Sequence, residues 1–264
     1  KTLHALQKPI LYGLVGPNAD PAAAQAVLRE FNAEAEALAR VRHPNVLRFF
    51  GVGYTGAPAA PRWIVTERQP QSLHTFVRTP GIQGALDLDG VLLLCLDIAD
   101  GLSYLHSLGM VHRDLKPKNV LVGGGGAKLA DLGTAKMIGI AARTAQHTVG
   151  PGTPVYHPRE VLEGRYTGAI DVFSLGLVFY YVWERKLPSV KGALNVDAHR
   201  AAINSGARPA FYRTPRAVRG LIERMWAYQP RKRASAAAVS AFLEDCEVKP
   251  SLTGLCVRAP ARGV

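Results

Sequence analysis

The sequence predicts an α+β fold with two lobes, in which a small antiparallel sheet with one helix precedes a larger, mainly helical part. Short apolar stretches at residues 46–54 and 63–66 are rich in branched and aromatic residues, as strands are. From residue 87 onward, apolar residues recur at every third or fourth position, which indicates helices. The 264 residues suffice for two lobes, and 48% hydrophobic with 20% charged residues is typical of a globular chain.

The first lobe is predicted to hold strands and a single helix. Residues 1–11 are expected to be extended, and a helix follows at residues 22–42, where the apolar positions keep near-helical spacing. Pro44 cannot continue this helix, because proline lacks the backbone N–H that a helix interior uses. The strands at residues 46–54 and 63–66 then complete the sheet.

The second lobe is predicted to be helical apart from one hairpin. Residues 87–107 carry one apolar stripe, and residues 119–130 form a hairpin with a glycine-rich turn. Residues 170–183 are apolar nearly all round, so they should form a buried central helix. Two amphipathic helices are expected at residues 216–228 and 235–245.

These elements divide the chain into three parts. Residues 1–69 form the first lobe with the joint that follows Thr66, and residues 70–247 form the second lobe. Residues 248–264 are rich in proline, glycine and arginine, which predicts an irregular tail.

Charge and cysteine usage narrow the class of partner. The net charge is +12, but the basic residues are scattered and no row of aromatics lies between them, which argues against nucleic acid as a partner. The apolar run at residues 91–96 is far shorter than a membrane span, and no signal-peptide pattern is present. Three cysteines without metal-ligand spacing indicate a reducing compartment, so we expect an intracellular, cytoplasmic protein.

Two short segments carry the residues suited to chemistry. Residues 112–119 read His-Arg-Asp-Leu-Lys-Pro-Lys-Asn, and residues 131–133 read Asp-Leu-Gly. The first matches every fixed position of the pattern H-R-D-L-x-x-x-N, and the second stands where D-F-G follows it. Taken singly, such residues are most often caps, turn formers or packed side chains. Taken together, they make the sequence resemble the eukaryotic protein kinase catalytic domain.

The resemblance implies a role for four residues. Asp114 is expected to orient the substrate hydroxyl and accept its proton, and Lys116 to offset the charge of the transferred phosphate. Asn119 and Asp131 offer hard oxygen ligands, so they are expected to bind Mg²⁺ between the phosphates of ATP. The family uses a lysine at the place of Lys116 in enzymes that modify serine or threonine. ATP, Mg²⁺ and a protein substrate are therefore the expected partners.

The strand at residues 63–69 resembles the segment that binds adenine in this family. Thr66 would be the gatekeeper, and the backbones of Glu67 and Gln69 would bond the edge of the base. Leu121 would form the floor beneath it. Judged without the other motifs, plain core is the alternative for this strand, and binding of adenine is the interpretation we favour.

Motifs farther along the chain agree with the resemblance. Residues 152–160 are similar to G-T-x-x-Y-x-A-P-E, although the last three read Pro-Arg-Glu. The family pairs the residue at Glu160 with an arginine at the place of Arg233. Asp171 resembles the aspartate that anchors the backbone of the catalytic loop, and His112 is expected to pack in the interior.

The pattern departs from the family at the N-terminus. The resemblance calls for a strand lysine paired with a helix glutamate, for which Lys8 and Glu34 are the choices, with Glu36 as a weaker alternative to Glu34. Leu6 stands where the family has alanine, and no G-x-G-x-x-G precedes Lys8. Either the chain begins after that loop, which we favour, or the loop does not exist.

Two functions follow from these observations. The leading one is a kinase that transfers the γ-phosphate of ATP to serine or threonine of proteins, since the expected base and metal ligands are all present. The alternative is a pseudokinase that acts as a binding or scaffold module. Arg113 beside Asp114 also resembles kinases that are switched by phosphorylation, so an upstream kinase is expected to modify Thr144 or Thr148.

Overall fold

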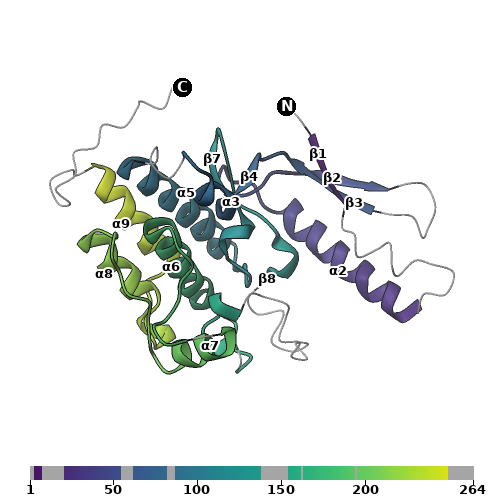
Figure 1. Ribbon diagram of the computed structural model, residues 1–264. Coiled ribbons are helices and arrows are strands. Elements are labelled where there is room, and N and C mark those ends of the chain that lie inside the picture. The colour runs from purple at the N-terminus through teal and green to yellow at the C-terminus, as the bar shows by residue number, and fades with distance from the viewer. Residues whose placement is uncertain are drawn as a thin grey trace.

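The computed structural model of the chain shows two lobes (Figure 1). A small sheet and the long helix α2 (Pro21–Ala39) form one lobe, and a cluster of helices forms the other. This arrangement confirms the predicted two-lobed α+β fold. The structure describes residues 3–7, 21–54, 62–81, 87–137, 154–161, 163–193 and 195–248.

The sheet of the small lobe has three antiparallel strands in the order β1-β3-β2. They are β1 (Leu3–Gln7), β2 (Phe49–Tyr54) and β3 (Arg62–Glu67). The strand β1 pairs with β3 from Leu3 opposite Glu67 to Gln7 opposite Trp63. The central strand β3 is therefore the one that leads directly into the second lobe.

Two boundaries of the small lobe differ from the prediction. The strand β2 begins at Phe49 rather than at Val46, because Val46 and Leu47 pair with the other lobe instead: the Leu47 N–H donates to the Leu129 carbonyl at 2.8 Å. The helix α2 ends at Ala39 rather than at Arg42. Its end is a tighter turn, in which the Val41 N–H donates to the Leu38 carbonyl.

The large lobe is built around α6 (Gly168–Glu184), whose residues from Ile170 to Glu184 are all buried. This confirms the central helix that the apolar run predicted. The other helices of this lobe are α3 (Leu73–Arg78), α5 (Leu88–Ser107), α7 (Val196–Asn204), α8 (Arg216–Met225) and α9 (Ala236–Val248). Among the described residues, every helix is too short or too polar to cross a lipid bilayer.

Short strands at the junction of the lobes hold the predicted hairpin. The strands β6 (Val120–Gly123) and β7 (Gly126–Leu129) pair from Val120 opposite Leu129 to Gly123 opposite Gly126, which confirms the glycine turn. The two-residue strand β4 (Gln71–Ser72) adds to the edge of β6. A separate pair joins β5 (Met110–Val111) to β8 (Lys136–Met137), on either side of the site described below.

Asn45 connects the small lobe to α5 and β7. Its side-chain amide donates to the Ala127 carbonyl at 3.1 Å, and its carbonyl accepts from the Leu129 N–H at 2.8 Å. Gly101 of α5 lies against the same carbonyl, because a Cβ added at Gly101 would stand 2.5 Å from the Asn45 oxygen. A glycine is therefore needed here by close approach of the two backbones.

The substitution Gly101→Ala is expected to destabilise the protein. Overpacking costs about 1–3 kcal/mol, which exceeds the gain of about 1 kcal/mol from the better helix propensity of alanine. Urea unfolding measures the difference in the free energy of unfolding between Gly101→Ala and the wild type. The matched control is Gly220→Ala in α8, where an added Cβ meets nothing within 4 Å and stabilisation is expected. Equal stabilisation of both variants would contradict the close contact at Asn45.

Candidate active site

Asp171, at the start of α6, fixes the loop that precedes the site. Its carboxylate accepts from the backbone N–H of His112 and of Arg113, both at 2.8 Å, and lies 2.9 Å from the His106 ring. The side chain is 1% exposed, so these donors offset the loss of water around the carboxylate. The predicted anchoring of the loop by Asp171 is confirmed.

His112 lies in the interior and connects the two loops that carry the site. It is 0% exposed, and its Nε2 lies 3.1 Å from the carbonyl oxygen of Ala130, the residue before Asp131. The packing role expected for His112 is thus confirmed. Through this contact the position of residues 130–131 depends on that of the loop at residues 112–119.

The Asp114 side chain is bonded by two of the other residues predicted to be catalytic, Lys116 and Asn119. One carboxylate oxygen, Oδ2, lies 2.5 Å from the Lys116 Nζ and accepts from the Asn119 amide at 3.0 Å. The same amide donates to the Asp114 backbone carbonyl at 2.9 Å. Asp114 is 8% exposed, so its orientation is fixed by these bonds in a mostly buried setting. Three residues predicted to be catalytic therefore meet in one place.

The Asn119 amide nitrogen donates to Asp114, and no hydrogen bond to the Asn119 side-chain oxygen occurs among the described residues. Its backbone carbonyl accepts from the Ala130 N–H at 2.9 Å, which brings the segment before Asp131 beside it. Both backbone polar groups of Ala130 are therefore bonded: its N–H donates to Asn119, and its carbonyl contacts the His112 ring.

Asp131 adopts a left-handed backbone conformation, with φ 60° and ψ 63°. Such a conformation costs a residue other than glycine about 1–3 kcal/mol and persists only where the surroundings impose it. Here Ala130 is fixed on one side, and on the other Leu132, at 1% exposed, is packed in the core. The strained backbone presents the Asp131 side chain to solvent rather than to the core.

The side-chain oxygens of Asn119 and Asp131 are of the kind that Mg²⁺ prefers as ligands. Asn119 offers an amide oxygen and Asp131 an exposed carboxylate, both hard ligands. No group of three His, Cys, Asp or Glu side chains suited to a metal occurs in the part of the chain that the structure describes. Mg²⁺ needs no such cage, because it is commonly held by one or two protein oxygens together with phosphate and water.

The segment predicted to bind adenine lies at the end of β3. Thr66 is 2% exposed, and its hydroxyl has no hydrogen-bond partner among the described residues. The Glu67 N–H already donates to the Arg48 carbonyl at 2.9 Å, so the Glu67 backbone can offer adenine only its carbonyl. Gln69 and Leu121 are both half-buried. The binding of adenine by these residues stays a prediction.

Several predicted residues fall outside the described part of the chain. They are Lys8 and the two candidate phosphorylation sites, Thr144 and Thr148. Glu34 lies in α2, but its side chain is likewise outside what the structure describes, whereas the alternative, Glu36, is exposed. The Lys8–Glu34 pair and the phosphorylation sites therefore stay predictions.

Glu160 and Arg233 form a buried ion pair in the large lobe. Both nitrogens at the end of the Arg233 guanidinium bond the Glu160 carboxylate, and Nη1 also donates to the Ala169 carbonyl at 2.8 Å. The side chains are only 3% and 1% exposed. This confirms the predicted pairing of the two residues, which come from distant parts of the sequence.

His157 is a neighbour of the site that the sequence did not single out. Its pKa is lowered, mainly by burial, while the Asp114 carboxylate acts in the opposite direction. Its Nε2 is buried without a hydrogen-bond partner among the described residues. His157 occupies a variable place in the motif that ends at Glu160, so the motif gave no reason to notice it.

Comparison with known proteins identifies the family. The protein-family model described as "Protein kinase domain" matches residues 19–242, which is most of the chain. The chain therefore belongs to the protein kinase domain family, as the motifs at residues 112–119 and 131–133 indicated.

Three relatives show the breadth of the match. The chain is 32% identical over 75% of its length to a dual serine/threonine and tyrosine protein kinase of Strongylocentrotus purpuratus. It is 32% identical over 82% of its length to the serine/threonine/tyrosine-protein kinase HT1 of Arabidopsis thaliana. It is 31% identical over 80% to mitogen-activated protein kinase kinase kinase 7 of Drosophila melanogaster. The match spans 20%, 54% and 31% of these relatives, respectively.

Proposed function

We propose that this domain is an active, Mg²⁺-dependent kinase that transfers the γ-phosphate of ATP to serine or threonine hydroxyls of proteins. The observation that carries the proposal is the orientation of the Asp114 carboxylate by Lys116 and Asn119. Such preorganisation is what phosphoryl transfer requires, because positioning and charge neutralisation supply most of the catalysis.

Each residue has a separate task in the proposed reaction. Oδ2 of Asp114 is occupied by its two neighbours, so Oδ1 is the atom that accepts the proton of the substrate hydroxyl. Lys116 stands beside it, where its ammonium group offsets negative charge on the transferred phosphate. Asn119 and Asp131 would hold Mg²⁺, which neutralises charge on the phosphates of ATP.

The choice of serine or threonine rests on Lys116 alone. Its ammonium group lies 2.5 Å from Oδ2 of Asp114, and the link between a lysine at this place and serine or threonine comes from the resemblance. The names of two of the relatives cover serine, threonine and tyrosine together, so the assay should offer the three acceptors separately.

The competing proposal is a pseudokinase, which Leu6 at the place of the family's alanine and the departures at residues 158–159 favour. Arg159 stands where the family has proline, and its guanidinium lies 4.3 Å from the centre of the Tyr228 ring. The substitution is therefore accommodated by a new contact on the surface of the large lobe. It does not touch Asp114, Asn119 or Asp131, so the expected catalytic residues are unaffected by it.

Binding of ATP with Mg²⁺ is expected to stabilise the folded domain. A ligand at about 100 times its Kd adds about 2.7 kcal/mol to the free energy of unfolding, because it binds only the native state. Differential scanning fluorimetry with ATP, with and without Mg²⁺, measures this. The variant Asp131→Asn should lose the dependence on Mg²⁺ while retaining the melting temperature of the unliganded protein. Absence of any shift in the wild type would favour the pseudokinase.

A further inference from the structure

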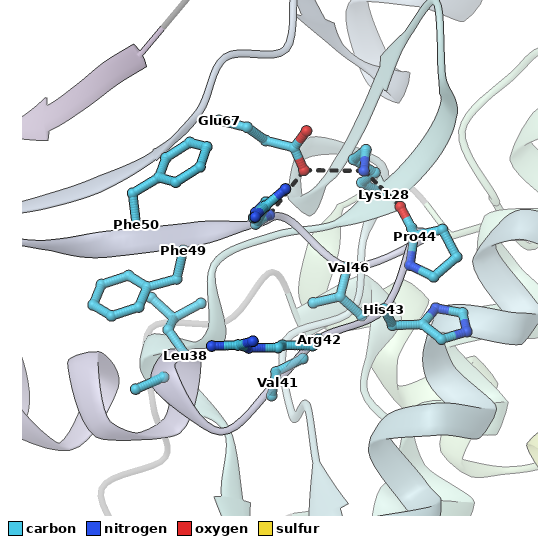
Figure 2. Close-up of a pocket in the computed structure, with 12 residues that line it drawn as sticks. Leu38, Val41, Arg42, His43, Pro44, Val46, Phe49, Phe50, Glu67 and Lys128 are labelled. Carbon is cyan, nitrogen blue, oxygen red and sulfur yellow. Dashed lines mark hydrogen bonds and ion pairs between the residues drawn. The ribbon is translucent and has the colours of Figure 1, made fainter. Parts of the chain in front are cut away.

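A pocket of about 700 Å³ lies at the junction of α2, β2 and the end of β3, and we call it the α2–β2 pocket. Figure 2 shows Leu38 from the end of α2 and Val41 from the turn that follows it, both below Phe49 of β2. Glu67 and Lys128 close its far side. Ligand pockets commonly have volumes of about 300–1,000 Å³, so it has room for a few side chains.

The pocket is distinct from the proposed ATP site. Among the residues expected to contact adenine, Glu67 contributes to both, but its side chain is the part that faces the α2–β2 pocket (Figure 2). Thr66, Gln69 and Leu121 are not among the described residues that line it. A ligand here would therefore leave the predicted adenine contacts accessible.

The charge of the lining is positive. Lys128 is neutralised locally, since its Nζ lies 3.0 Å from Glu67 Oε1 and donates to the Pro44 carbonyl at 2.6 Å. The pKa of His43 is lowered, chiefly because the ring is partly buried, and this favours its neutral form. Arg42 and Arg48 then remain as two cations that face no further carboxylate among the described lining residues.

The two arginines stand beside apolar surface. Figure 2 shows the Arg42 side chain extended toward Leu38 and Phe49, and it forms no ion pair within the described structure. The Arg48 guanidinium lies 5.4 Å from the centre of the Phe50 ring. Phe50 itself is 39% exposed, although it is a large aromatic residue. The pocket thus combines two arginine cations with one exposed aromatic ring, Phe50, and the half-buried Phe49.

The strand β2 adds a further recognition element. It is an outer strand in the order β1-β3-β2, and Phe49 and Phe50 at its start line the pocket. An outer strand presents backbone groups that an extended segment of another chain can pair with. A small anion would use the arginines alone, whereas an extended peptide would also use the apolar wall and the strand edge.

We infer that the α2–β2 pocket docks an extended segment of a partner protein that carries an acidic residue next to an aromatic or aliphatic one. The carboxylate would bond the Arg42 guanidinium, which suits bidentate recognition. The neighbouring apolar side chain would pack on Phe49, toward which the Arg42 side chain extends, whereas Phe50 lies on the other side of β2 (Figure 2). This inference does not depend on catalytic activity, because none of its residues belongs to the proposed catalytic set.

Selection from a library of random peptides displayed on phage, with the whole chain as bait, tests the inference. Recovered peptides are synthesised with a fluorescein label, and their Kd is measured by fluorescence anisotropy. We expect enrichment of acidic residues beside apolar ones, and binding about tenfold or more weaker to Arg42→Glu, since a charge-assisted contact becomes a repulsion. The matched control is Arg40→Glu, an exposed arginine two positions away that does not line the pocket.

Other results would overturn the inference. These are recovery of no peptide, recovery of neutral or basic peptides, or a Kd that Arg42→Glu leaves unchanged. Sedimentation that reveals a dimer dissociated by Arg42→Glu would assign the pocket to a second copy of this chain instead. The melting temperatures of both variants show that the fold is retained, and Arg42→Ala repeats the test without the reversed charge. Peptide binding that persists in Asp131→Asn separates this result from any failure of the proposed kinase activity.

Discussion

The substitution Glu160→Ala is expected to lower the free energy of unfolding by about 3–5 kcal/mol, because it leaves the guanidinium of Arg233 buried without its carboxylate. The remaining contacts of Arg233, with the carbonyls of Ala169 and Ala227, do not neutralise its charge. Chemical denaturation followed by circular dichroism measures the loss. For a domain of this size, such a loss is a large fraction of the total stability.

The chain supplies a matched control for this prediction. Glu163 and Arg165 form an ion pair close to Glu160, but their side chains are 43% and 64% exposed. Surface pairs contribute about 0–1 kcal/mol, so Glu163→Ala should have little effect. A similar, small loss in both variants would contradict the view that burial makes the Glu160–Arg233 pair important. A large loss confined to Glu160→Ala would support it.

The helices with the strongest apolar pattern were the most predictable parts of the fold. The segments that became α5 and α6 were located nearly to the residue, since each buries a long apolar surface. The short helix α3 was not predicted, because six residues give too little periodicity. The start of β2 was misplaced because Val46 and Leu47 pair with Leu129 in the other lobe, a contact that no local pattern encodes.

The site residues that lie in one short segment were predictable, and those that come from separate segments were not. The motif at residues 112–119 located Asp114, Lys116 and Asn119 together, because its spacing is fixed by one short loop. The Glu67–Lys128 pair was not predicted, since its members lie on separate strands with unremarkable neighbours in sequence. The α2–β2 pocket likewise depends on three segments that meet only in the folded chain. Local patterns thus identified the proposed chemistry, whereas surfaces assembled from several segments required the structure.

The substitution Asp114→Asn is expected to lower the rate of phosphoryl transfer by about 10²–10⁴-fold, the usual contribution of a positioned general base. An amide oxygen can still accept from Lys116, but an amide group cannot take up the proton of the substrate hydroxyl. Initial rates with labelled ATP and peptides that carry serine, threonine or tyrosine measure the effect. The apparent affinity for ATP should change little, since Asp114 is not among the proposed metal ligands.

Two comparisons make this prediction specific to the carboxylate of Asp114. The exposed neighbour Lys118 lies in the same loop, and Lys118→Ala should retain the wild-type rate. The stabilisation of Asp114→Asn by ATP and Mg²⁺ should match that of the wild type, which shows that the loop keeps its shape. If Asp114→Asn retained more than about a tenth of the wild-type rate, below the range for a general base, Asp114 would not be the proton acceptor. Its bonds to Lys116 and Asn119 would then serve the shape of the loop alone.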